Sequence, residues 1–422
     1  MEIFLAIVAV AALGLAATSQ PAYRLRRSRA VAGLLSTGWP ALVIGLLLGP
    51  HVSGLIDESS LIDATPLLMI GLGWIGVIVG LQLRREVLEA LPRRIVGFTV
   101  IDVVITGVVF AVVAWLGLRA WTDGQRPAEL WAGMVLIAST AVAWSMETRS
   151  VRPAGESNAV QRASLAIRAG GALGAVAAIA AFGIGAALTR RLDDGIVRFD
   201  VPAAGVRLAL TAVLAIALGI FGRYFLRVAG KQREHELVVF LGVVVFAAGV
   251  SAQLGLSPML GAMLTGAVIA NLGSTDLRAF ERFVLKAEHT VAVFFSVLAG
   301  VLLEPRIGAG GLALVGAIVA ARLIVKPLVS RAGYTLAEDD DDGPVSERPQ
   351  RGLVGLRLAC ARQSPIAVAL AVGLVLAEPS AFNQKLLAVV AFAGLACELL
   401  VLGVAAAERI TTGDEMEETA SA

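Results

Sequence analysis

The sequence predicts an all-α protein that crosses a membrane many times. Of its 422 residues, 57% are hydrophobic and 16% are charged, whereas soluble domains carry about 25% charged residues. The mean hydropathy is +0.82. Apolar runs of about 20 residues, the length that one helix needs to cross a bilayer, recur along the whole chain. Such runs are expected to be helices, because a helix satisfies its backbone polar groups within its own segment.

Short polar segments divide the chain into about thirteen apolar spans that are long enough to cross a membrane. They begin near Ile3, Ala30, Ala64, Arg94, Leu130, Ser164, Ala203, Glu236, Ser257, His289, Ile307, Gly352 and Phe382. The first span resembles a signal peptide, but Glu2 and the lack of Lys or Arg at its start favour a retained helix. Residues 1–410 are expected to form one transmembrane domain, and residues 411–422 an acidic cytoplasmic tail.

The loops predict the orientation of the spans. Loops on one side hold roughly twenty Lys and Arg residues, and those on the other side about six. The positive-inside rule then places the N-terminus outside and the C-terminus in the cytoplasm. The long acidic connection "TLAEDDDDGPVSERPQRG" runs against this trend, but Asp and Glu contribute little to the rule.

Two spans contain polar interruptions. The fifth, "LWAGMVLIASTAVAWSME", carries Ser139 and Thr140, and the twelfth carries Gln363 and Ser364 directly before Pro365. Interrupted helices at matching positions of two halves are typical of transporters with inverted repeats, in which freed backbone groups form the substrate site. The alternative is that the hydroxyls bond within their own helix and the proline only kinks its span.

Several motifs carry a resemblance to a known family. They are "LLLGPHVSGLID" (46–57), "LMIGLGWIGVIVGLQLRREVLEALPRR" (68–94), "LGLSPMLGAMLTGAVIAN" (254–271) and the following "VAVFFSVLAGVLLEP" (291–305). With them the chain resembles the monovalent cation:proton antiporter-2 family, the Kef-type and related bacterial sodium/proton antiporters. The resemblance implies thirteen helices with two crossed broken helices, and a core domain that moves against a panel domain. It also implies a homodimer in the inner (plasma) membrane that exchanges a monovalent cation for protons.

The resemblance also assigns residues to the ion pathway. Ser139 and Thr140 match the family's first break, and Gln363 to Pro365 lie where the second break is expected. Lys326, or Arg322 one turn earlier, lies where the family places a basic residue. The departure is Arg168: the family carries an Asp pair or Asn-Asp there, whereas residues 167–171 contain no carboxylate.

Arg168 is expected to have a partner or a route to an interface, because placing an arginine at the centre of a membrane helix costs about 2.5–3.5 kcal/mol on insertion scales. At about 1.5 Å per residue, Arg168 lies roughly 9 Å in from Arg162, and Asp102 roughly 12 Å in from Arg94 on the same side. The depths therefore allow an Arg168–Asp102 pair. One interpretation is that both residues only pair or snorkel to an interface. Another is that Asp102 is a displaced proton or cation site.

A third interpretation is an anion site. Embedded basic residues outnumber the embedded acids Asp102 and Glu398; they are Arg168, Arg322, Arg357 and Arg362. The alternative is that Arg322 and Arg357 lie near the cytoplasmic ends of their spans and snorkel to the interface, which leaves only two deeply buried arginines.

Other classes of function find no support. The net charge of +2 indicates no nucleic-acid partner. No enzyme chemistry, cofactor or metal cluster is predicted, and the two cysteines read as small core residues. The sequence therefore predicts a cation/proton antiporter with an atypical ion site. The alternatives are an anion or organic-acid transporter on the same scaffold, and a non-transporting membrane subunit or sensor.

Overall fold

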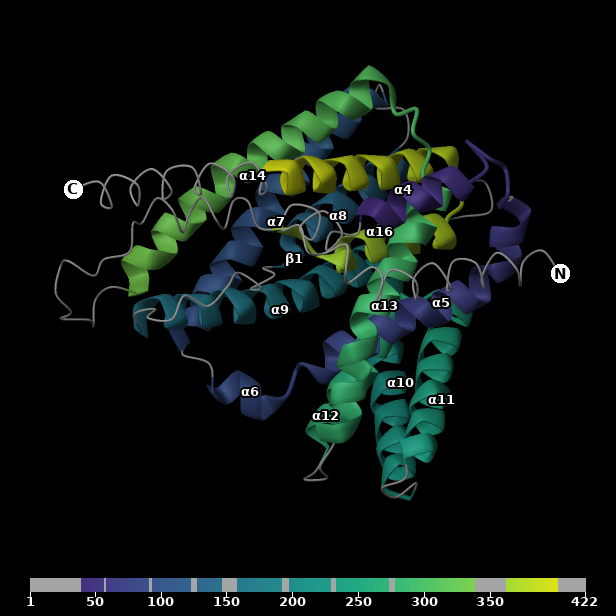
Figure 1. Cartoon of the computed structure of the whole chain (residues 1–422), viewed down its shortest axis with the longest axis vertical. Helices are drawn as coiled ribbons and strands as arrows, with labels where there is room; N and C mark the ends of the chain where they lie inside the picture. Colours follow the sequence, from purple (N-terminus) through teal and green to yellow (C-terminus); the bar gives the residue numbers. More distant parts are fainter. Residues whose placement is uncertain are drawn as a thin grey trace, which may run out of the picture.

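The computed structural model describes residues 39–56, 58–90, 93–122, 127–145, 158–191, 197–228, 233–272, 278–337 and 362–400, nearly all of them helical (Figure 1). The elements are α4 (Trp39–Leu48), α5 (Glu58–Leu81), α6 (Arg85–Ala90), α7 (Arg93–Trp121), α8 (Pro127–Val142), β1 (Trp144–Ser145), α9 (Asn158–Ala187), β2 (Thr189–Arg191), β3 (Val197–Phe199), α10 (Val201–Val228), α11 (Arg233–Gln253), α12 (Pro258–Asn271), α13 (Arg278–Leu302), α14 (Gly308–Ala337), β4 (Arg362–Gln363) and α16 (Pro365–Ala377). The helix Ala381–Leu400 completes them.

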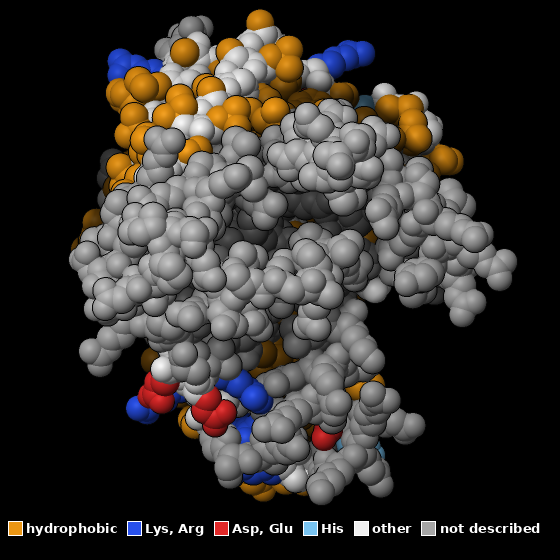
Figure 2. Space-filling model, turned by 60° about the vertical axis from the view of Figure 1, so that its left-hand side comes forward, with side chains coloured by type: hydrophobic (Ala, Val, Ile, Leu, Met, Phe, Trp, Pro, Cys, Tyr) orange, Lys and Arg blue, Asp and Glu red, His pale blue; other side chains and the backbone are white. Residues whose placement is uncertain are grey.

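The predicted class, an all-α polytopic membrane protein, is confirmed. Six described helices are long and apolar enough to cross a membrane, and six more contribute shorter apolar stretches of 10–17 residues. Side chains such as Val206, Val213 and Tyr224 of α10 are more than 60% exposed, as expected of a surface that faces lipid. Figure 2 shows hydrophobic side chains over much of the upper part of one face.

Some predictions concern residues outside the described ranges. These are the first span, the first half of the twelfth, the acidic connection, Arg357 and the tail 411–422. The count of thirteen spans therefore stays a prediction.

Two pairs of helices pack closely enough for their backbones to touch. A Cβ added to Gly45 of α4 would lie 1.9 Å from the carbonyl oxygen of Val297 in α13. A Cβ added to Gly80 of α5 would lie 2.0 Å from that of Met263 in α12. Only glycine permits these approaches, so the α4–α13 and α5–α12 contacts, here called the glycine seams, are encoded in the sequence.

The packing partners follow the pattern expected of two related halves. α4 packs on α13 and α5 on α12, while α7 packs on α14 and α8 on α16. If α4, α5, α7 and α8 correspond in order to α12, α13, α14 and α16, exchanging the halves carries the first seam onto the second. The same exchange leaves the other two pairs unchanged. This agrees with the inverted repeats predicted from the two interrupted spans.

Buried apolar side chains form two clusters. The larger includes side chains of α7, α8, α14 and α16, and the smaller lies among α5, α10, α11 and α12. In Figure 1, α10 and α11 lie at one end of the molecule and α14 at the other. The interrupted spans thus belong to the larger cluster.

Candidate functional site

The two interrupted spans meet inside the protein. α8 ends at Val142 and continues as the extended pair β1, while β4 leads into α16. The two strands pair antiparallel, with Trp144 opposite Gln363 and Ser145 opposite Arg362. The backbone N–H of Ser364 also donates to the carbonyl of Ala143 over 3.3 Å. Both spans are therefore interrupted as predicted, and the two breaks satisfy part of each other's freed backbone. The first break begins at Ala143, however, and not at Ser139 and Thr140, which lie in the last turn of α8.

The start of α16 follows from its local sequence. Ser364 is the N-cap (φ −64°, ψ 143°), and its side-chain oxygen accepts a hydrogen bond from the Ile366 N–H at 3.3 Å. Pro365 occupies the first helical turn, where it has no N–H to leave unpaired. Ser257 and Pro258 begin α12 in the same way. A Ser-Pro pair inside an apolar run thus predicts a new helix start.

The crossing brings opposite helix ends together. The C-terminal end of α8 carries a partial negative charge, and the N-terminal end of α16 a partial positive charge. Thr140, in the last turn of α8, donates its hydroxyl to the Ile137 carbonyl at 3.0 Å. Ser139 is only 1% exposed, and its hydroxyl has no hydrogen-bond partner among the described residues. Ser139 therefore offers an unused polar group beside the crossing.

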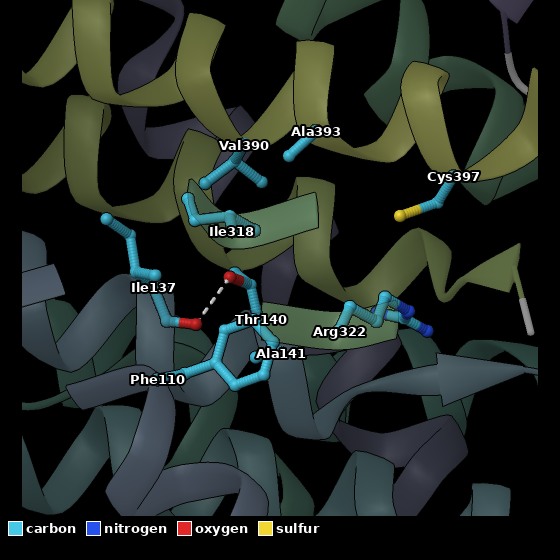
Figure 3. A pocket seen from close by; sticks show the side chains of 9 residues that line it. All are labelled: Phe110, Ile137, Thr140, Ala141, Ile318, Arg322, Val390, Ala393 and Cys397. Carbon is cyan, nitrogen blue, oxygen red and sulfur yellow. Dashed lines mark hydrogen bonds between the residues drawn. The ribbon is translucent and has the colours of Figure 1, made fainter. Parts of the chain in front are cut away.

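A small cavity adjoins the end of α8 (Figure 3). The volume of this cavity is about 20 Å³, enough to hold about one water molecule. Its lining residues are Phe110, Ile137, Thr140, Ala141, Ile318, Arg322, Val390, Ala393 and Cys397. Arg322 is 4% exposed, and its cation near the C-terminal end of α8 is favourable for the helix dipole.

The most strongly paired charges in the described interior lie between α7 and α14. The Lys326 Nζ lies 2.7 Å from both Oδ1 and Oδ2 of Asp102. The Thr106 hydroxyl donates to Asp102 Oδ1 over 3.2 Å. Asp102 is 4% exposed and Lys326 3% exposed. A charge pair removed from water in this way needs close geometry and further hydrogen bonds to be tolerated, and both are present.

The ion pair and the cavity lie along the same two helices. Asp102, Thr106 and Phe110 follow one face of α7 at four-residue spacing, and Phe110 lines the cavity. Arg322 and Lys326 stand one turn apart on α14. Asp102 and Phe110 are separated by eight residues, or about 12 Å along the helix axis. Asp102 thus lies about two turns of α7 from the cavity-lining Phe110, and Lys326 one turn of α14 from the cavity-lining Arg322.

The structure changes the expected partner of Asp102. The depths of Arg168 and Asp102 along their spans allowed the two residues to pair, but the described partner of Asp102 is Lys326. Arg168 lies in α9, and its side chain is outside the described residues, as are those of Arg362 and Gln363. The suggestion that Arg322 snorkels is corrected, because Arg322 is buried at the cavity. Snorkelling would require its guanidinium to reach an interface.

Sequence reasoning named both Asp102 and Lys326 but did not join them. It missed Thr106, for which the only available signal was a hydroxyl residue four positions after a buried acid. That spacing places both side chains on one helix face.

Comparison with known proteins agrees with this architecture. Residues 40–407 match the family described as "Sodium/hydrogen exchanger, transmembrane". Among solved structures, the fold is similar to that of the sodium proton antiporter MjNhaP1 from Methanocaldococcus jannaschii at pH 8. The TM-score is 0.64 at 13% sequence identity, over 95% of this chain and 98% of that chain. No curated protein matches the chain in sequence.

Proposed function

This chain belongs to the transmembrane sodium/hydrogen exchanger family and is a cation/proton antiporter, and we propose that Asp102 and Lys326 form its exchange site. The observation that carries the proposal is the buried contact of 2.7 Å between the Lys326 ammonium and both oxygens of Asp102.

An antiporter needs a site at which a proton and a metal cation exclude each other. A carboxylate provides one, because its negative charge attracts any cation and can be neutralised by protonation or pairing. Among the described residues, Asp102 is the one Asp or Glu that is fully buried. Residues 167–171 contain no carboxylate, so Asp102 takes the role that relatives resembling this chain give to an acid in that helix.

The two buried cations of α14, Lys326 and Arg322, have different roles. Lys326 already occupies the carboxylate of Asp102, so an incoming metal cation must displace its ammonium. A lysine in an apolar site can release its proton as it is displaced, whereas an arginine keeps its charge throughout. Lys326 therefore couples cation entry to proton release. Arg322 supplies a fixed positive charge that stabilises the end of α8.

The remaining features of the proposal concern the whole protein. The Lys and Arg asymmetry of the loops supports an N-terminus outside and a C-terminus in the cytoplasm of a plasma-membrane protein. The motifs in 46–94 and 254–305 support the antiporter-2 branch of the family. The same resemblance supports a homodimer in which a core domain around the crossing moves against a panel domain.

The proposal is tested by reconstituting the protein in proteoliposomes and measuring proton flux driven by Na⁺ or K⁺ gradients. Asp102→Asn keeps the shape of the side chain but removes its charge, so cation-driven flux is expected to fall to background. The matched control is Asp200→Asn. Asp200 caps α10 by accepting from the Ala203 N–H at 2.9 Å, and asparagine caps equally well. The control should therefore retain flux.

Two results would contradict the assignment. One is cation-driven flux in Asp102→Asn equal to that of the wild type. The other is proton-coupled uptake that responds to anion gradients and is lost in Arg322→Gln, which would favour the anion transporter on this scaffold.

A further inference from the structure

Thr106 differs from four other helical threonines of the described ranges in how it uses its hydroxyl. A threonine within a helix commonly donates to the carbonyl four residues earlier. Thr65, Thr122, Thr211 and Thr265 all do so here, over 2.8–3.2 Å. Thr106 is 0% exposed, yet its hydroxyl donates to a side chain, the Oδ1 of Asp102. Its hydroxyl is therefore directed at the carboxylate.

The Lys326 ammonium shows where a cation sits on this carboxylate. The ammonium is itself a monovalent cation, and it contacts both oxygens of Asp102 at 2.7 Å. One of these oxygens, Oδ1, also accepts the Thr106 hydroxyl. Any cation that replaces the ammonium would therefore bind next to Thr106.

We infer that Thr106 is the second protein ligand of the transported monovalent cation, with Asp102 as the first. The inference rests on the proposed exchange site and adds the residue that selects among cations. A hydroxyl has one proton to donate and two lone pairs. Thr106 can therefore keep its bond to Asp102 while a lone pair faces the cation. Oxygen atoms are the ligands that hard cations prefer.

Thr106 would affect selectivity because a second oxygen fixes the size of the site. A single carboxylate can approach a small or a large cation equally freely. Two oxygens held on successive turns of α7 set a separation that suits some ionic radii better than others. Loss of the hydroxyl should weaken binding of the preferred cation most.

The test compares Thr106→Val and Thr106→Ser with the wild type in proteoliposomes, using Li⁺, Na⁺ and K⁺. Valine keeps the shape but removes the hydroxyl, so KM for the preferred cation should rise about tenfold or more. We expect kcat to change little and the preference among the three cations to narrow. Serine keeps the hydroxyl and should restore both KM and the preference. The matched control is Thr265→Val, at an equally buried threonine of α12 whose hydroxyl donates to the Gly261 carbonyl of its own helix at 2.9 Å.

A second measurement uses purified protein. Cations that bind only the folded state raise Tm, so Thr106→Val should need about tenfold more Na⁺ than the wild type for the same rise. If Thr106→Val does not fold, Thr106→Ala removes the hydroxyl without adding bulk and takes its place.

Three outcomes separate the hypotheses. An unchanged KM in Thr106→Val, with flux still lost in Asp102→Asn, would overturn the role of Thr106 and leave the exchange site standing. An equal rise in KM for all three cations would reduce Thr106 to a residue that orients Asp102, which also overturns the inference. Unchanged flux in Asp102→Asn would remove the exchange site itself.

Discussion

At the scale of single residues, the buried ion pair of Asp102 and Lys326 is costly, so its presence calls for an explanation. Taking two charges out of water costs several kcal/mol per ion, and apolar residues of similar size often serve stability as well or better. The pair also holds a lysine, which can lose its proton, rather than an arginine, which cannot. Both facts favour a role in exchange over a role in stability.

If the pair serves exchange, substitutions that restore the stability of the protein should not restore its transport. Lys326→Met leaves the Asp102 carboxylate buried without its cation, so unfolding free energy at pH 8 should fall by about 3–5 kcal/mol. Adding Asp102→Leu removes the stranded charge and should restore most of that loss. Thermal unfolding in detergent measures both effects, and proteoliposome flux should be absent from both variants.

A matched control uses the exposed pair Arg85–Glu89, whose side chains lie one turn apart on α6. Breaking it with Glu89→Gln should change stability by less than about 1 kcal/mol. Equal stability of Lys326→Met and the wild type would mean that the buried contact does not form.

The elements show how short motifs shape a membrane protein. Ser364 and Pro365 end the extended segment and begin α16, while the glycine seams bring whole helices into backbone contact. The seams matter because apolar side chains gain no hydrophobic advantage from leaving lipid. Close packing and van der Waals contact must therefore hold the helices together.

In the glycine seams, adding a single methyl group should markedly lower the free energy of unfolding. Gly45→Ala and Gly80→Ala would each place a Cβ within about 2 Å of a backbone oxygen that cannot rotate away. Each should lower unfolding free energy by about 1–3 kcal/mol, measured by thermal unfolding in detergent. Gly242→Ala and Gly249→Ala in α11 serve as controls, because nothing lies within 4 Å of their added Cβ atoms. Equal losses in the seams and the controls would argue against the close packing.

The whole molecule combines two halves around the crossing. The crossing strands, the cavity with Arg322, and the Asp102–Lys326 pair lie on α7, α8, α14 and α16 or between them. The smaller cluster lies among α5, α10, α11 and α12, and α5 and α12 also contribute side chains to the larger cluster.

Competition at one site predicts the pH dependence of the whole exchanger. If proton and cation share the Asp102–Lys326 site, as we propose, a lower pH favours the protonated, paired state. The apparent KM for Na⁺ should therefore rise as pH falls from 8 to 6, while saturating Na⁺ recovers the maximal flux. Flux measured over a grid of pH and Na⁺ concentration checks this. A KM independent of pH would indicate separate sites for proton and cation.

The sequence by itself determined the membrane class, the course of the apolar helices, the two breaks and the helix starts at Ser-Pro. These depend on composition and on neighbours along the chain, which a sequence displays directly. It also placed Asp102, Arg168, Arg322 and Lys326 inside spans. Only the tertiary structure decided that Asp102 meets Lys326 and Thr106 and that Arg322 lines the cavity beside the end of α8. Counting residues yields the depth of a side chain along a helix, but not the direction it faces or which helix packs beside it. Asp102 and Lys326 are 224 positions apart in sequence, so only the packing of α7 on α14 brings them together.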